Sequence, residues 1–370
     1  MTFSSKFRAL LLGAATCLAV FPAGASISLA ASGDSNRAAA TDRLVDAISE
    51  KLEASGLSVI VGLGRIGETR HFREFGTFRD DGLAPEETLV DLGSNTKAVT
   101  AAVVLKHVES GTLKLDDTLD ILLEDVPEDK KSITLRQLLT HRAGLPDAVG
   151  SDEERIGRED YLARVFRTPL LSQPGTSYAY SNVGYALLAA ILERKTGEAF
   201  EPLMAKTLFP NAEIPAIGYE TTYREDASAI SGRIWLTLYR KLPIHRASWG
   251  GSTVGWNLLG NGGAVATPPD AMTFYEDLVG GRIVDPALWQ EGFTHGGEIP
   301  TPKSYGFGIV RLQSSDGTIV YTHSGANIVF SVDWRYVPNS GLNIFIAGLE
   351  DEAGDAMDIV MKQVSTAQLR

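Results

Sequence analysis

The feature that most restricts the fold is a single lysine in an apolar helix near residue 100. In the segment LGSNTKAVTAAVV, Lys97 stands three positions after Ser94 and is followed by a run of Ala and Val. The helix expected over 95–108 has apolar side chains on more than one face, which predicts that it is buried. A cation in its first turn faces the positive end of the helix dipole and loses its hydration. A purely structural helix has no need of such a residue.

Helix capping accounts for the serine and leaves the lysine unexplained. Serine is a favoured N-cap, but a capping box would place Glu or Gln where Lys97 stands. A buried lysine has a lowered pKa, and it can accept a proton from a hydroxyl one turn away. Ser94 is therefore a candidate nucleophile and Lys97 a candidate general base. The backbone N–H of Ser94 is then a candidate donor to an oxyanion.

Two further motifs carry side chains that such chemistry needs. Tyr180-Ser181-Asn182 directly precedes an apolar helix, and a tyrosine phenol there can pass a proton to a leaving group. The alternative is a half-buried loop tyrosine beside a capping Ser or Asn. His323-Ser324-Gly325 ends a predicted strand, whose edge could line a substrate and offer the Ala326 N–H as a second oxyanion donor. Taken alone, a histidine such as His323 is more often a structural residue of a strand.

The order of the predicted elements indicates a discontinuous α/β (α+β) fold. The short helix over 133–144 has a capping box, Thr134 with Gln137, and Gly144 is expected to close it. Periodicity and turn signals predict helices over 41–55, 95–108, 133–144 and 352–369, and strands over 57–63, 69–75, 305–313, 318–323, 331–337 and 342–348. We expect an antiparallel sheet flanked by N- and C-terminal helices. An α/β lobe of about 41–93 plus 301–370 would then carry an inserted, mostly helical lobe of about 94–300.

The N-terminus has the pattern of a secretory signal peptide over residues 1–25. Lys6 and Arg8 precede an apolar run over 9–21, and Ala23-Gly24-Ala25 fits a cleavage site, with Ser28-Leu29-Ala30 as a second option. The alternative is a short membrane anchor. Cleavage would remove Cys17, the only cysteine, and no histidines stand in H-x-x-x-H spacing. We therefore expect a secreted or periplasmic protein without disulfide, metal or cofactor, and without stable membrane insertion after cleavage.

Charge and two decoy motifs exclude other classes of function. A formal net charge of −12 argues against a general affinity for nucleic acid. Lys195-Thr196-Gly197 spells K-T-G, a catalytic motif that belongs on a strand. Here it ends a predicted helix, where Lys in the last turn and Gly just after it are ordinary C-terminal signals. The G-x-G-x-x-G over 62–67 follows a strand, but no apolar helical stripe opens after it. A hairpin turn fits that segment better than a dinucleotide site.

With these residues in hand, the chain resembles the serine β-lactamase and penicillin-binding superfamily, in its class C-like branch. That branch includes D-alanyl-D-alanine carboxypeptidases, D-aminopeptidases and related esterases of the peptidase S12 type. Its ordered motifs are S-x-x-K, Y-x-N and then K-T-G or H-x-G, and they match Ser94–Lys97, Tyr180–Asn182 and His323–Gly325. The flanks ITLRQLLTHRAGLP, QPGTSYAYSNVGY, GNGGAVATPPDAM and YGFG are similar to the family as well, and the likeness covers roughly 41–350.

The resemblance implies a β-lactamase/transpeptidase-like fold and a role for each motif residue. Ser94 would be acylated, Lys97 would be the base or its partner, and Tyr180 would assist proton transfer. Asn182 would bind the substrate amide. His323, Ser324, Gly325 and Ala326 would hold the acyl donor, with the Ser94 and Ala326 N–H groups as the oxyanion hole. The third motif has His where many members have Lys, which weakens the attraction for a substrate carboxylate at neutral pH and favours a peptidase or esterase over an efficient β-lactamase.

We therefore expect an exported serine hydrolase that acts through an acyl-enzyme on D-Ala-type peptides, β-lactams or small esters. Its partner would be a small-molecule or peptide substrate, peptidoglycan stem peptides included. One alternative is a catalytically weak, penicillin-binding-like sensor that keeps the acylation site. A remote alternative is an NAD-linked oxidoreductase built on the G-x-G-x-x-G over 62–67.

Overall fold

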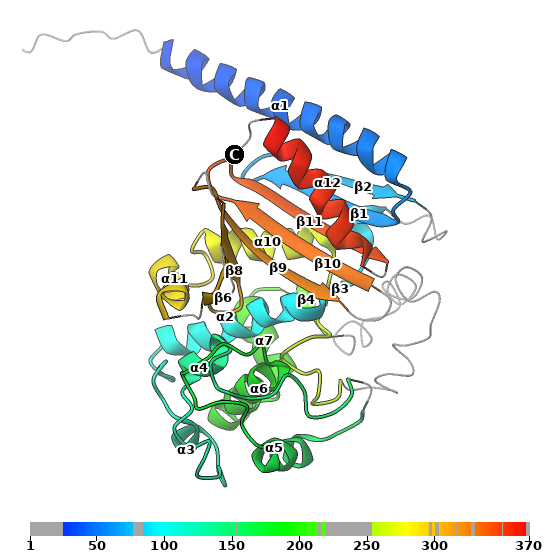
Figure 1. Ribbon diagram of the computed structural model, residues 1–370. Coiled ribbons are helices and arrows are strands. Elements are labelled where there is room, and N and C mark those ends of the chain that lie inside the picture. Colours follow the sequence, from blue (N-terminus) through cyan, green and yellow to red (C-terminus); the bar gives the residue numbers. More distant parts are fainter. Residues whose placement is uncertain are drawn as a thin grey trace, which may run out of the picture. The chain divides into compact units, whose positions relative to one another are not determined.

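An antiparallel sheet joins the two ends of the chain in the computed structural model (Figure 1). Its strands are β1 (Val59–Arg65), β2 (His71–Phe75), β6 (Glu298–Ile299), β7 (Lys303–Tyr305), β8 (Val310–Gln313), β9 (Ile319–Ala326), β10 (Phe330–Val337) and β11 (Leu342–Leu349). They lie in the order β2-β1-β11-β10-β9-β8-β7-β6, so that β1 pairs directly with β11. This sheet and its flanking helices confirm the expected α/β fold.

The structure describes residues 25–76, 84–152, 154–212, 216–219, 254–295, 298–299, 303–314, 317–326, 330–349 and 351–367. Leu44–Arg370 forms one compact unit, and the residues up to Arg43 form another. The signal peptide expected over residues 1–25 lies outside the described residues, apart from Ala25, where a helix begins. None of the described helices is long and apolar enough to cross a bilayer. The limits of the two expected lobes stay a prediction.

Short elements and most of the helices lie in the chain between β2 and β6, while one helix precedes β1 and one follows β11. The short elements are η1 (Pro85–Glu87), β3 (Val90–Asp91), η2 (Gly93–Asn95), β4 (Ile217–Gly218) and β5 (Val265–Ala266), and β3, β5 and β4 pair as a second small sheet. The helices are α1 (Ala25–Ser55), α2 (Thr96–Glu109), α3 (Leu119–Leu122), α4 (Leu135–Leu139), α5 (Arg158–Arg167), α6 (Asn182–Thr196), α7 (Phe200–Leu208), α10 (Pro268–Val279), α11 (Pro286–His295) and α12 (Glu352–Thr366).

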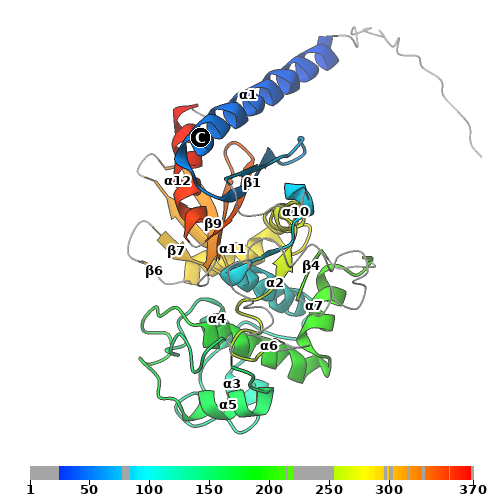
Figure 2. The same cartoon turned by 90° about the vertical axis from the view of Figure 1, so that its right-hand side faces the viewer.

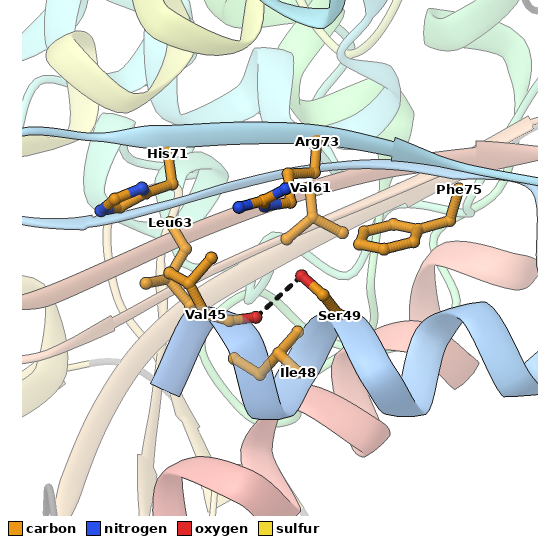
Figure 3. Close-up of a pocket in the computed structure, with 8 residues that line it drawn as sticks. All are labelled: Val45, Ile48, Ser49, Val61, Leu63, His71, Arg73 and Phe75. Atoms are coloured by element: carbon orange, nitrogen blue, oxygen red, sulfur yellow. Dashed lines mark hydrogen bonds between the residues drawn. The ribbon is translucent and has the colours of Figure 1, made fainter. Parts of the chain in front are cut away.

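One face of the large sheet is covered by α12 and by α1 from Leu44 onward (Figure 1). Leu44, Ile48 and Leu52 of α1 are buried there, as the helical periodicity of the sequence predicts. Figure 3 shows Val45 and Ile48 facing side chains of β1 and β2, with the Ser49 hydroxyl donating to the Val45 carbonyl at 2.8 Å. The crevice left between them is small and mostly apolar, and we assign it to packing.

The opposite face of the sheet packs on α10 and α2 and, beyond them, on α4, α6 and α7 (Figure 2). The first ten residues of α2, Thr96 to Leu105, are all buried, which confirms that this helix is enclosed on every side. The core around it is built from Ala, Val and Leu of α2 and α6. The segment from Ser94 to Lys97 therefore lies at the start of a deeply buried helix.

The helix expected over 41–55 begins earlier, at Ala25. Two other expected elements differ from the structure next to the candidate site. The helix expected over 133–144 keeps its Thr134–Gln137 capping box but ends at Leu139, because His141 takes a left-handed φ of 57°. The strand expected over 305–313 is split into β7 and β8 by a turn at Gly306–Gly308. Gly308 has a φ of 74°, and a Cβ there would stand 2.8 Å from the Lys97 carbonyl. The turn thus packs directly on the backbone of α2.

The two decoy motifs have the structures that their sequences predict. The segment over 62–67 ends β1 and turns into β2, which pairs with β1 in an antiparallel hairpin, so no helix opens at its third glycine. Lys195 and Thr196 end α6, and Gly197 closes the helix with a left-handed φ of 74°. The hairpin at 62–67 therefore lacks the helix that a dinucleotide site needs. Lys195-Thr196-Gly197 lies at a helix end and not on a strand, as the third motif would.

The sheet is tied to α10 by one buried amide, which gives a stability prediction. Asn343 accepts from Trp334 Nε1 at 2.8 Å and donates to the Met272 carbonyl at 3.1 Å and to Glu276 Oε1 at 3.0 Å. Asn343→Leu keeps the size of the side chain but removes these three hydrogen bonds. We therefore expect the free energy of unfolding, measured in urea, to fall by about 3 kcal/mol. The exposed Asn211→Leu is the control. A loss as small as that of the control would contradict this role.

Candidate active site

Ser94 lies in η2, pressed between the small sheet and the end of β9. Gly93 donates its N–H to Asp91 Oδ1 at 2.6 Å and has a φ of 48°, a conformation that favours glycine. A Cβ on Gly93 would stand 3.0 Å from the Ala326 nitrogen, and one on Gly325 would stand 2.5 Å from the Ser94 nitrogen. Both glycines are therefore needed for this approach. The two amides predicted as oxyanion donors lie on these adjoining backbones.

The Lys97 ammonium is fully buried and has three hydrogen-bond partners. Its Nζ lies 3.0 Å from Ser94 Oγ, 2.6 Å from Asn182 Oδ1 and 2.8 Å from the carbonyl oxygen of Asn261. The structure thus brings the serine of the first motif and the asparagine of the second motif to one nitrogen. Asn182 Oδ1 and the Asn261 carbonyl are acceptors only, so each must receive an N–H of Lys97.

Burial lowers the pKa of Lys97 from 10.5 to about 7. The carboxylates of Asp147 and Asp152 act in the opposite direction and keep the pKa from falling further. The neutral form of the lysine is therefore accessible near neutral pH. Because the unfolded chain binds this proton up to pH 10.5, burying Lys97 costs stability at neutral pH, and that cost shrinks as the pH rises from 7 to 10.5.

Tyr180 leans over the serine and the lysine from the loop before α6. Lys97 Nζ lies 4.8 Å from the centre of its ring. Burial raises the pKa of Tyr180, while the nearby Ser94 side chain opposes that rise. The phenol therefore keeps its proton at neutral pH and can act as a donor.

Asn182 begins α6 and is held by the loop that precedes α5. Its backbone N–H donates to the Asp147 carbonyl at 2.9 Å and its Nδ2 donates to Asp147 Oδ1 at 3.0 Å. Ser181 caps the same helix end by accepting from the Gly184 N–H at 3.1 Å. The side-chain oxygen of Asn182 is turned to Lys97, so the structure gives this residue a second task beside the predicted one of binding a substrate amide.

The third motif lies at the end of β9, as predicted. His323 is buried, its Nε2 is 3.0 Å from the Tyr305 hydroxyl, and its Nδ1 is 2.8 Å from the Ser324 carbonyl. Burial, and then the charge of Lys97, lower the pKa of His323 to about 3. The imidazole is therefore uncharged at neutral pH. Ser324 and Ala326 are exposed on the strand, where a substrate can reach them.

A hollow of about 340 Å³ opens beside Tyr180 and the third motif. Charged residues of both signs stand on its wall, with the cations Lys303 and Arg335 and the carboxylate of Asp333. The remaining lining residues are Tyr178, Tyr180, Tyr305, Val310, Leu312, Thr322, His323 and Ser324. The space is bordered by residues of the second and third motifs and has the mixed apolar and polar wall of a ligand site.

Sequence reasoning missed three residues of this site. Asn261 acts through its backbone carbonyl, which no side-chain pattern can indicate, although it stands in the GNGG of a flank. Tyr305 partners His323 from the YGFG flank. His141 is buried among the rings of Tyr180 and Tyr305, each with its ring centre 4.4 Å away, and was expected inside a helix. In all three cases the flanks carried the signal.

Comparison with known proteins gives the same picture. The model of the family described as Beta-lactamase matches residues 41–353. Penicillin-binding protein 4* of Bacillus subtilis (strain 168) is 29% identical over 176 residues, which are 45% of this chain and 38% of that protein. Protein flp of Staphylococcus aureus (strain MW2) is 30% identical over 162 residues, 37% of this chain and 32% of that protein. The matched part is thus about a third of the length of these curated relatives.

Solved structures share the fold over most of the chain. The D-amino acid amidase from Ochrobactrum anthropi SV3, complexed with L-phenylalanine amide, has a TM-score of 0.70 at 20% identity and covers 88% of this chain and 99% of that one. The D-stereospecific amidohydrolase from Streptomyces sp. has a TM-score of 0.68 at 22% identity, over 86% and 98%. The penicillin binding protein from Bacillus halodurans has a TM-score of 0.68 at 21% identity, over 85% and 98%.

The state of Lys97 gives a pH prediction. A neutral lysine is the form that accepts a proton. The labelling of Ser94 by a fluorophosphonate, which phosphonylates the hydroxyl, should therefore speed up as the pH rises through about 7. Asp147→Asn keeps the oxygen that Asn182 uses and removes a charge that raises the pKa of Lys97. We therefore expect this variant to reach its plateau at lower pH. A profile that does not move in Asp147→Asn would contradict the electrostatic reading.

Proposed function

Because the chain belongs to the Beta-lactamase family, in the serine β-lactamase and penicillin-binding superfamily, we propose that it is a serine hydrolase that forms an acyl-enzyme on Ser94. The proposal is supported above all by the surroundings of Lys97 Nζ. A neutral lysine has two N–H groups and one lone pair. Asn182 Oδ1 and the Asn261 carbonyl take the two N–H groups, because neither can donate. The lone pair is left for the third neighbour, the Ser94 hydroxyl.

The proposed acylation moves one proton in a closed sequence. Ser94 Oγ attacks the carbonyl carbon of the substrate as its proton passes to Lys97. The oxyanion that forms is held by the N–H groups of Ser94 and Ala326. As the carbon–nitrogen or carbon–oxygen bond breaks, the Tyr180 phenol protonates the leaving atom and regains a proton from Lys97. Water then attacks the acyl-enzyme, and its proton passes through the same groups to Ser94 Oγ. The acid product leaves and the free Ser94 hydroxyl is restored.

The substrate class that we propose is an amide or ester, as in D-Ala-type peptides, amides of D-amino acids, β-lactams or small esters. The names of the amidase and amidohydrolase neighbours support amides. The uncharged His323 offers no cation at the third motif, which favours a peptidase, amidase or esterase over an efficient β-lactamase. Lys303 and Arg335 stand in the hollow as the cations that would meet an anionic group of the substrate.

We propose further that the protein is exported. Its support is the charge and apolar pattern of residues 1–25, which has the form of a cleavable signal peptide. Export would place the enzyme in the periplasm or outside the cell, where peptidoglycan stem peptides are available as substrates. The class C-like branch is also part of the proposal and rests on the three motifs.

The test of the proposed function is the intact mass of the protein after exposure to a fluorophosphonate and, separately, to a penicillin. Wild type should gain one adduct from the fluorophosphonate, and Ser94→Ala, which removes only the hydroxyl, should gain none. A penicillin adduct that persists indicates a peptidase or a sensor, and one that clears quickly indicates β-lactamase activity. Wild type without any label, or a label that survives in Ser94→Ala, would contradict the proposal.

A further inference from the structure

His141 lies behind Tyr180 and is strained in two ways. It is one of only two non-glycine residues with positive φ in the described part of the chain, and a left-handed backbone is uncommon for any residue other than glycine. It is also buried, with an Nε2 that has no hydrogen-bond partner among the described residues. Features of this kind persist only where the surroundings hold them in place, and they gather at functional sites.

The bonds of His141 show what holds it there. Its carbonyl oxygen accepts from the Ala179 N–H at 2.9 Å, and its Nδ1 accepts from the Ser181 N–H at 3.1 Å. These are the residues on either side of Tyr180. One residue therefore fixes the backbone before and after the tyrosine. The ring of His141 also packs on the ring of Tyr180, with centres 4.4 Å apart.

The backbone and the ring tautomer are both fixed by this arrangement. An amide N–H can only donate, so Nδ1 of His141 must be the unprotonated nitrogen, and the proton lies on Nε2. The left-handed φ turns the chain out of α4, where an uninterrupted helix would have carried the side chain elsewhere. The left-handed backbone and the unpartnered Nε2 thus follow from the position of His141. In that position its carbonyl and its Nδ1 both accept from the loop that carries Tyr180.

We propose that His141 is a positioning residue, which holds the phenol of Tyr180 over Ser94 by binding the backbone on both sides of it. The inference rests on the proposed function. His141 is buried and is not among the residues that line the hollow. Its effect passes through Tyr180, because the phenol stays beside Ser94 and Lys97 only if the loop keeps its place.

Two nearly isosteric variants separate the acceptor from the bulk of the side chain. His141→Asn places an amide oxygen where Nδ1 stands, and asparagine tolerates a left-handed φ. His141→Leu has the same branching without the acceptor. The readout is the second-order rate constant for labelling of Ser94 by a fluorophosphonate, with the thermal unfolding of each variant measured beside it. His141→Ala replaces the leucine variant if the latter does not fold.

Tyr180→Phe sets the scale, because it removes the phenol itself and should slow labelling by about tenfold or more. We expect His141→Leu to slow labelling to a similar degree and His141→Asn to stay within about threefold of wild type. In the Tyr180→Phe background, His141→Leu should add less than about twofold, since residues that act through one group are not additive. A residue that merely supports the fold would slow both backgrounds alike.

The outcomes distinguish this inference from the proposed function. Wild type that takes no label overturns the proposed function and the inference with it. If wild type is labelled but Tyr180→Phe reacts just as fast, the phenol has no role for His141 to support. If Tyr180→Phe is slow, the inference alone is overturned by His141→Leu at the wild-type rate, by His141→Asn as slow as His141→Leu, or by multiplicative losses in the double variant.

Discussion

The structure depends on one buried nitrogen and the two carbonyl oxygens that it meets. Lys97 can be accommodated inside the core because Asn182 Oδ1 and the Asn261 carbonyl accept from it. Those two acceptors come from segments about 80 residues apart, so the lysine fixes the start of α6 and the loop before β5 against the start of α2. The cost of burying the charged form is what brings its pKa down to about 7. Burial therefore lowers stability at the position where we propose that a base acts.

The sheet contributes by approaching this helix start more closely than side chains would permit. Gly93 and Gly325 bring the backbone of β9 onto η2, and Gly308 brings the turn between β7 and β8 onto α2. A single Cβ at any of these positions would meet backbone atoms at 3.0 Å or less. The backbones of β9 and of the turn between β7 and β8 therefore reach the start of α2 because glycine is present at each contact, which links the sequence of the flanks to the geometry of the site.

Much of this could be predicted from the sequence, and the limits have physical causes. The apolar run around Lys97 gave the burial and the lowered pKa, because both follow from local composition. The gathering of Tyr180 and His323 around Ser94 came from the resemblance, since no periodicity specifies contacts across 80 or 230 residues. The role of the Asn261 backbone carbonyl could not be predicted, because every residue has a backbone carbonyl. His141 was misplaced, because helix periodicity carried the prediction through a residue whose left-handed φ is imposed by tertiary contacts.

The central claim, that Lys97 is neutral over much of the working range, is tested most directly by measuring its pKa. The protein would be labelled with ¹⁵N-lysine and its Nζ resonances followed by NMR as a function of pH, with Lys97→Met used to assign the signal. The account predicts one resonance that titrates near 7 and is missing from the variant. A Lys97 signal that keeps the shift of a charged ammonium up to pH 9 would contradict the account, and the role of general base would then have to pass to another group.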